Sequence, residues 1–447
     1  MDNYAHQACI RCRKQKRKCN RLLPICSRCK KLDLSCRYHG ILEDQAQSSL
    51  DSPLDALTPM PDVDQLSHTL QSHVSSIIGD KAAIAQSAAT YFGTIHTWFP
   101  TVNRDAYYRS LLGSHSNPRP TVSLLTLCVY LLAMQPTDGM SRRMNGLYIL
   151  VTGFVASLGA AGVNNLDLLQ SRILLSLFEV GHGMYPAGYI SMGANIRTAV
   201  AIGANLPSDQ LTNRFVSLEA ADDARRIWQG LVILDRYVSM EMENAPSISK
   251  EGYISFPDQT TLNELQDSTS FMKLYHASNL VDQVLAHVFN ATPYEQKSAE
   301  AIPLLESLAS FRGSLQNPEK SDLSYLATAL CSSAFMTILE FGYLLNHPVG
   351  KDCSPLSFVL LEAEVQQFLK AGEEFTQVIA AGDAVNIPVF SVHSIGKAAI
   401  IILRYLRDSE TVDVSSSLNC LTGLLELMNR RWLAAGVYLE KIQRESD

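Results

Sequence analysis

The chain has 447 residues, of which 47% are hydrophobic, 18% charged and 8% aromatic, and its net charge is −7. This length and apolar content exclude a mostly disordered chain and suffice for more than one ordinary domain. Residues 1–40 hold eleven Lys or Arg and two Asp or Glu, whereas the rest of the chain holds 26 basic and 42 acidic side chains. A small basic head on a large acidic body predicts a polyanionic partner for the head alone.

Cysteine usage divides the chain at the same place. Six of the ten cysteines occur in the head, with the spacing C-x2-C-x6-C-x6-C-x2-C-x6-C. The N-terminus is polar and no apolar segment follows it, which favours a reducing compartment and metal binding over disulfides. The six fall into two halves of identical internal spacing: Cys9, Cys12 and Cys19, then Cys26, Cys29 and Cys36.

Coordination chemistry predicts the metal content of this cluster. Structural zinc takes four ligands in tetrahedral geometry, and soft thiolates favour zinc. Three thiolates in each half leave each ion one ligand short, so six sulfurs complete two sites only if two of them bridge. We therefore predict two Zn²⁺ ions, whose binding supplies most of the folding free energy of the head. The alternatives are a mononuclear ribbon with two spare cysteines and an iron–sulfur cluster, whose four-ligand spacings do not match.

The head resembles the binuclear zinc cluster (zinc-two-cysteine-six) DNA-binding domain of fungal transcription factors. The resemblance covers all six cysteines and the basic run between Cys12 and Cys19. It implies that Cys9 and Cys26 bridge the two ions. It also implies that Pro24 shapes the loop between the halves, often through a cis peptide bond.

Basic residues of the head are the predicted DNA contacts. These residues are Arg11, Arg13, Lys14, Lys16, Lys18 and Arg21. Lys and Arg donate to guanine O6 and N7 in the major groove of double-stranded DNA, or neutralise phosphates. The resemblance assigns Lys16 to the reading of a CGG triplet, and Arg13, Lys18 and Arg21 to phosphates. Gln15 departs from the Lys or Arg that the family often has there.

Residues 41–62 are predicted to form an acidic linker between the head (1–40) and the body (63–447). No Lys or Arg occurs between Arg37 and Lys81, and Pro53, Pro59 and Pro61 interrupt this stretch. Its interleaved leucines leave two functions open, an acidic-hydrophobic activation segment or a plain tether.

The body is predicted to be one large all-α domain. Apolar residues recur at three- and four-residue spacing, and strand-like alternation is nearly absent. The predicted helical stretches are 63–77, 84–98, 121–134, 142–160, 166–180, 187–204, 217–243, 260–290, 298–313, 323–346, 355–381, 388–406 and 411–440. The first gives about two heptads, fewer than a dimerising coiled coil needs, so a homodimer stays open. The uncharged stretch Asn145–Leu166 favours a buried helix pair over a membrane span, and no membrane partner is expected.

Three body segments resemble the regulatory (middle-homology) domain that follows this zinc cluster in fungal transcription factors. They begin at Tyr91, Gly193 and Arg225, and the third continues into Ala245–Ile248 and Phe256–Asp258.

Charged and histidine side chains in and near these segments are expected to be structural. Asp235 and Arg236 are expected to form ion pairs along and between helices. Their candidate partners are Arg225, Arg226 and Glu219. His96 and His182 lack a second metal ligand three or four residues away, so packing or exposure is expected.

Catalytic motifs are not supported. The segment Gly188–Gly193 resembles a nucleophile elbow, but its first glycine is one residue too early and no strand precedes it. Gly181–Pro186 ends in Pro where a dinucleotide loop needs Gly or Ala.

The sequence therefore predicts a nuclear, sequence-specific transcription factor, with co-regulators as possible partners, and not an enzyme. Resemblance alone suggests targets among metabolic or secondary-metabolite genes. The alternative is an interaction protein whose zinc cluster is structural or grips phosphate without sequence preference.

Overall fold

The chain divides into two compact units, residues 1–61 and 62–447. The computed structural model describes residues 4–5, 7–36, 38, 62–113, 119–137, 140–242, 245–249, 268–290, 293–315, 325–344, 354–380, 387–407 and 413–446. The predicted linker therefore lies, except for Asp62, outside the described residues, as does Phe256–Asp258.

Helices account for the regular structure throughout the described residues, which confirms the all-α prediction. The first unit has two short helices, α1 (Ile10–Lys14) and α2 (Ser27–Lys31). Pairing of the strand type is confined, in the described ranges, to one antiparallel bridge between Tyr4 and Leu22. The second unit contains α3 (Val63–Ile77), α4 (Lys81–Gly93), α5 (Ile95–Trp98), α6 (Arg104–Gly113), α7 (Pro120–Ala133), α8 (Met140–Ala160), α9 (Leu166–Gly181), α10 (Ala187–Ile202), α11 (Ser208–Arg214), α12 (Leu218–Glu241), α14 (Ser270–Phe289), α15 (Tyr294–Ser314), α16 (Tyr325–Leu344), α17 (Ser354–Ala380), η2 (Val389–Ser391), α18 (Val392–Tyr405), α19 (Val414–Asn429) and α20 (Ala434–Ser446).

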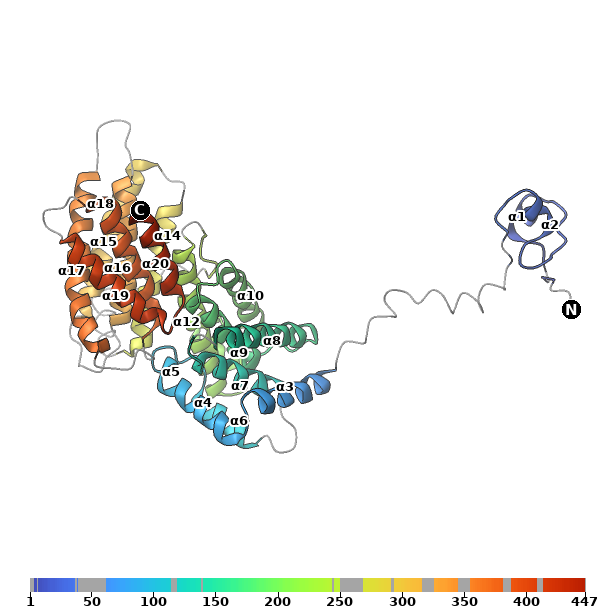
Figure 1. Cartoon of the computed structure of the whole chain (residues 1–447), viewed down its shortest axis with the longest axis horizontal. Coiled ribbons are helices and arrows are strands. Elements are labelled where there is room, and N and C mark those ends of the chain that lie inside the picture. The colour runs from blue at the N-terminus through green and yellow to red at the C-terminus, as the bar shows by residue number, and fades with distance from the viewer. Residues whose placement is uncertain are drawn as a thin grey trace. The chain divides into compact units, whose positions relative to one another are not determined.

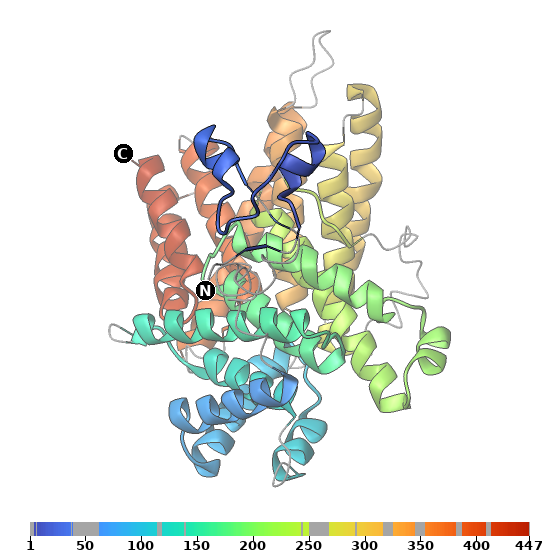
Figure 2. The same ribbon diagram turned by 90° about the vertical axis from the view of Figure 1, so that its right-hand side faces the viewer.

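Helix α12 joins two groups of helices in the second unit. Helices α14 to α20 stand side by side, and α7, α8 and α9 run crosswise to them (Figures 1 and 2). Helix α12 packs against α9 and α10 on one side and α14 on the other. Every residue from Gln229 to Met240 is buried. The second half of α12 is therefore enclosed on all sides by the core.

Two predicted helical stretches contain a break. The stretch 84–98 forms α4 and α5, because Thr94 leaves the helical conformation (φ −120°, ψ −87°) directly after Gly93. The stretch 411–440 forms α19 and α20, which are separated by a turn that carries Arg431 and Trp432. Periodicity missed α6 and α11, since both helices are short and α11 carries a single apolar residue.

The turn between α19 and α20 attaches the C-terminal helices to α7. Arg431 is 3% exposed and donates to the carbonyls of Leu132 and, at 3.1 Å, Met134. The last carbonyls of a helix have no intrahelical partner, so this guanidinium satisfies the end of α7. Trp432 donates from Nε1 to the carbonyl of Ile387 at 2.6 Å. These contacts hold together segments some 300 positions apart in the chain.

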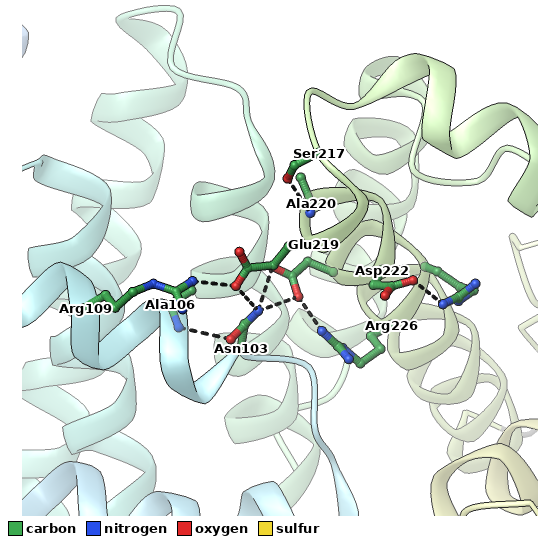
Figure 3. Close-up of polar contacts among 10 residues, drawn as sticks. Asn103, Ala106, Arg109, Ser217, Glu219, Ala220, Asp222 and Arg226 are labelled. Carbon is green, nitrogen blue, oxygen red and sulfur yellow. Dashed lines mark hydrogen bonds and ion pairs between the residues drawn. The ribbon is translucent and has the colours of Figure 1, made fainter.

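Polar side chains connect the start of α12 to the region of α6 (Figure 3). Glu219 accepts from Asn103 at 3.0 Å and forms an ion pair with Arg109 at 2.5 Å. Arg226 forms an ion pair with Asp223, also at 2.5 Å. These contacts attach the first part of α12 to the region of α6, while the second half of the helix is held by its burial in the core.

The predicted partners of Asp235 and Arg236 are wrong. Asp235 is fully buried, and its Oδ2 accepts from the backbone N–H groups of Ile248 at 2.8 Å and Ser249 at 2.7 Å. Arg236 donates to Asn279 on α14. The predicted partners lie nine to seventeen residues earlier on the same helix, which is more than two turns away and beyond side-chain reach. Asp235 instead anchors the segment that follows α12.

Two apolar stretches bear on the membrane question. Asn145–Leu166 forms most of α8, and the prediction of a buried helix pair is wrong: Leu147 and Val151 face the core, but Ile149 is 69% exposed. Among the described residues, α16 has the length and composition to cross a membrane, with a mean hydropathy of 1.3 over its most apolar window. Because 72% of that window is buried inside the protein, α16 serves as a core helix here.

Helix α3 buries the apolar face that was considered for a coiled coil. Leu66, Leu70 and Val74 are each at most 5% exposed. The helix packs against α7 and α8 of its own chain. In this conformation the face does not offer a seam for a second chain.

Close packing of α18 on α20 depends on Gly396. A Cβ atom at this position would lie 2.1 Å from Cδ1 of Tyr438. We expect Gly396→Ala to lower the free energy of unfolding by about 1–3 kcal/mol, because the ring must move within a packed core. Chemical denaturation of the full chain measures the change. The control is Gly423→Ala in α19, where a Cβ meets nothing within 4 Å and a rise of up to about 1 kcal/mol is expected; equal destabilisation by both changes would contradict the prediction.

Candidate zinc and DNA-binding site

The six cysteine sulfurs of the first unit converge on one centre. They form two sets of four in which all sulfurs lie within 4.8 Å of one another. The sets are Cys9, Cys12, Cys19 and Cys26, and Cys9, Cys26, Cys29 and Cys36. Only Cys9 and Cys26 belong to both sets. Each set holds the four thiolates that a structural zinc site requires.

Distances between the sulfurs fit zinc coordination. A tetrahedral site with Zn–S bonds of about 2.3 Å places its sulfurs about 3.8 Å apart. Sγ of Cys9 lies 3.8 Å from the Sγ atoms of both Cys26 and Cys29. Sγ of Cys12 lies 3.9 Å from that of Cys26. Donor type and spacing therefore both suit zinc.

The two halves of the cluster repeat the same local structure. Cys9 precedes α1 and Cys26 precedes α2, and each sulfur accepts from the backbone N–H three residues later at 3.4 Å. Sγ of Cys19 accepts from the backbone N–H of Cys9 at 3.5 Å, and Sγ of Cys36 from that of Cys26 at 3.3 Å. A sulfur at a helix N-terminus is favoured as an anion by the free N–H groups there. Identical spacing has produced identical caps.

Burial makes most of these thiols poor anions unless a cation is close. It raises the pKa of Cys9, Cys12 and Cys36. At Cys26 burial also raises the pKa, but hydrogen bonds from the N–H of Cys29 and from neighbouring thiols outweigh it and lower the pKa to about 6. Zinc binds the thiolate form, so a bound dication would offset the cost of keeping these groups ionised and buried.

Three further features close the head, and only the first was implied by the resemblance. The Leu23–Pro24 peptide bond is cis, in agreement with the resemblance. Tyr38 is buried and donates to the carbonyl of Leu22 at 3.0 Å. Asn20 accepts from the N–H of Ser27 at 2.9 Å, at the start of α2. No sequence pattern predicts these contacts of Tyr38 and Asn20, because the partner of each residue lies on the other side of the cluster.

The structure places the predicted DNA-binding residues on α1 and in the segment that follows it. Five of them are exposed: Arg13, Lys14, Lys16, Lys18 and Arg21. The sixth, Arg11, is half-buried and donates to Ser35 Oγ at 3.5 Å. Their charges therefore lie together on the surface of the first half of the head.

Each short helix is followed by a residue in the left-handed conformation. In the first half this residue is the predicted DNA contact Lys16, but its counterpart in the second half was not predicted from the sequence. Lys16 has φ 49° and Asp33 has φ 48°. Each backbone N–H bonds back three residues, to Arg13 at 3.1 Å and to Lys30 at 3.4 Å. Non-glycine residues adopt this conformation rarely. Equivalent positions, 17 residues apart like the cysteines, thus carry a cation in one half and an anion in the other.

Other residues that sequence analysis tested for chemistry are structural. The ring of His182 stacks on Phe178 with centroids 4.0 Å apart, and burial lowers the pKa of His182 to about 4. His96 packs against Phe92, and burial lowers its pKa to about 4 as well. Ser191 lies inside α10 and donates to Glu179 at 3.0 Å, so it does not sit on a nucleophile elbow.

Comparison with known families identifies the class of protein. The family described as "Fungal Zn(2)-Cys(6) binuclear cluster domain" matches residues 7–44. The family described as "Fungal specific transcription factor domain" matches residues 88–336, which is more than half of the chain. The chain therefore belongs to the fungal specific transcription factors that carry a zinc cluster, a family of zinc-binding, DNA-binding regulators and not of enzymes.

Two curated relatives carry names that agree with this class. "Transcription factor BOA15" of Botryotinia fuckeliana is 30% identical over 123 residues, which cover 27% of this chain and 66% of the relative. "Quinic acid utilization activator" of Emericella nidulans is 20% identical over 270 residues, which cover 51% of this chain and 32% of the relative. The chain thus spans about two thirds of the first relative and about one third of the second.

Proposed function

We propose that the chain is a nuclear transcription factor that docks on CGG-like half-sites through a cluster of two Zn²⁺ ions. The observation that carries the proposal is the pair of overlapping four-sulfur sets beside an exposed basic run. Cys9 and Cys26 would bridge the ions. Cys12 and Cys19 would complete one site, and Cys29 and Cys36 the other.

Native mass spectrometry of the full chain tests the metal proposal. We expect two zinc ions per chain, and a count of one would contradict the bridged cluster. Cys26→Ser should lose most of the zinc and leave the Lys- and Arg-rich head open to trypsin, because Cys26 belongs to both sets. Cys420→Ser, at a thiol of the second unit, is the matched control and should retain both the zinc and the resistant head.

The charges of the two halves support docking by the first half only. In the proposed complex, Lys16 donates to guanine, and Arg13, Lys18 and Arg21 contact phosphates, while Arg11 and Lys14 add to the positive surface. Asp33 takes the place of Lys16 in the second half. A carboxylate there is repelled by phosphates and by the acceptor edge of guanine. The head therefore has one DNA-facing side.

Replacement of Lys16 tests this assignment. Lys16→Asn is expected to weaken binding to a CGG duplex by about 1–3 kcal/mol and to remove the preference for that triplet. Asn tolerates positive φ, so the fold of the head should survive. Lys31→Asn, which removes one exposed cation from α2, is the control and should keep the preference. Competition binding with CGG and scrambled duplexes measures both; equal losses would contradict the assignment.

Asp33→Asn examines the other half. Loss of the anion should raise affinity for CGG and scrambled duplexes alike, by up to about 1 kcal/mol in low salt, because one repulsive charge is gone. Unchanged affinity would show that this face does not limit docking.

The targets are proposed to be genes of metabolism, such as a secondary-metabolite cluster. Support comes from the name of one relative, a quinic acid utilization activator. The α-helical second unit would then regulate the head or recruit co-regulators. The alternative function is an interaction protein whose zinc cluster only stabilises the head or grips phosphate.

A binding selection from random duplex DNA with the zinc-loaded full chain decides between these functions. Enrichment of one CGG triplet would indicate a single docked head, and two triplets at fixed spacing would indicate a homodimer. If nothing is enriched while binding still falls steeply with salt, the interaction-protein alternative is favoured. The position of the enriched motif in the encoding genome, upstream of neighbouring enzyme genes or not, then tests the metabolic assignment.

A further inference from the structure

A cavity of about 260 Å³ lies between α18 and α20, outside the residues that either family matches. Its walls are His393, Lys397, Ile400, Arg404, Tyr438, Lys441, Arg444 and Glu445. Four of these eight residues are cations, and one is an anion. Both helices contribute two cations, so positive charge faces the cavity from two sides.

The cations on the α20 side have little compensating charge. Among the described residues, Lys441 has no carboxylate partner, and its Nζ lies 5.1 Å from the ring centre of Tyr438. Arg444 pairs with Glu440 at 3.2 Å, but these side chains are 76% and 72% exposed. Water and salt screen such a surface pair strongly. Both cations are therefore available to a ligand.

On the α18 side the two cations are paired, but in different ways. Lys397 pairs with Glu340, whose residue is only 8% exposed, so this contact is part of the protein interior. Arg404 pairs with Glu445, whose side chain is 33% exposed and itself lines the cavity. The carboxylate of Glu445 thus contacts the guanidinium of Arg404 in the way that the acidic group of a ligand would.

Two buried lining residues, His393 and Tyr438, have hydrogen-bond partners outside the cavity. His393 is fully enclosed and its Nδ1 contacts Ser333 Oγ at 3.0 Å. Burial and the charges of Lys397 and Lys441 hold the pKa of His393 well below its usual value. Tyr438 donates to Glu241 at 2.8 Å, which links the cavity to the end of α12.

We propose that this cavity binds a small organic dianion, a dicarboxylate or a phosphate monoester. Its volume is below the usual 300–1,000 Å³ or so of small-molecule sites, so the ligand must be compact. Ile400 is the one aliphatic residue in its lining, which disfavours an apolar ligand. One acidic group would replace the carboxylate of Glu445 on Arg404, where a guanidinium can form two parallel hydrogen bonds. The second would contact Lys441 and Arg444.

The second unit would then have its own binding site for a small molecule. It does not depend on the proposed DNA docking, and it is tested without DNA. Because Tyr438 connects the cavity to Glu241, a bound ligand would contact a residue that is hydrogen-bonded to the central helix of the fold.

Calorimetric titration of the zinc-loaded full chain tests the proposal. The probes are succinate, malate and glycerol phosphate at constant ionic strength, with neutral succinamide as the uncharged comparison. Binding of at least one anionic probe and none of succinamide is expected. Whether the carboxylates or glycerol phosphate bind more tightly identifies the ligand class. Absence of binding by every probe, or equal binding of succinamide, would overturn the proposal.

Two double variants locate the binding. Lys441→Gln/Arg444→Gln should lower the affinity for the anionic probe at least about tenfold, which is the scale of one charge-assisted hydrogen bond. Lys370→Gln/Arg430→Gln removes the same charge from exposed sites outside the cavity and should bind like the unmodified chain. Equal loss in both double variants would mean nonspecific attraction and overturn the site.

Glu445→Gln separates ligand binding from structural damage. This change removes the internal competitor of the ligand and should tighten binding several-fold, an effect that loss of structure does not produce. Weaker binding in this variant would contradict the displacement of Glu445.

Discussion

Convergence of six sulfurs is the constraint on which the head depends. Among its described residues the buried side chains are few: Ala5, Tyr38 and four of the cysteines. Helices of five residues do not persist in isolation, because nucleation costs more than one turn returns. Coordination to a metal therefore replaces the hydrophobic core that a segment of this length cannot build. The basic surface has a fixed shape only because the positions of the six sulfurs are fixed.

The second unit is stabilised in the opposite way. Its core is a single cluster of buried apolar side chains that extends from α3 to α20. Charged groups inside this core have defined tasks: Asp235 holds the segment after α12, and Arg431 satisfies the end of α7. Each is expensive to bury and is retained next to backbone groups that need a partner. The interior charges thus fix how distant segments meet.

Sequence reasoning succeeded where function depends on local spacing. The cysteine pattern predicted both the metal and the family, since all six cysteines lie close together in the sequence with a spacing that repeats. Helical periodicity identified most of the body because each helix buries one face or more. It failed for Asp235, whose partners follow a chain reversal, and for the short helices α6 and α11. The cavity was also beyond reach, because the cations of α18 and α20 lie about forty residues apart and come together only in the folded core.

The repeated halves of the head have a consequence for direction. Cysteines, caps and helix ends recur after 17 residues, so the metal core has nearly the same two faces. Lys16 and Asp33 make those faces unequal. A head with two equal faces would fit a DNA site in either of two orientations related by a half-turn, whereas under the proposed docking this head would fit in a single orientation. If the head reads an asymmetric triplet as proposed, this inequality would give the bound head a forward direction along the duplex.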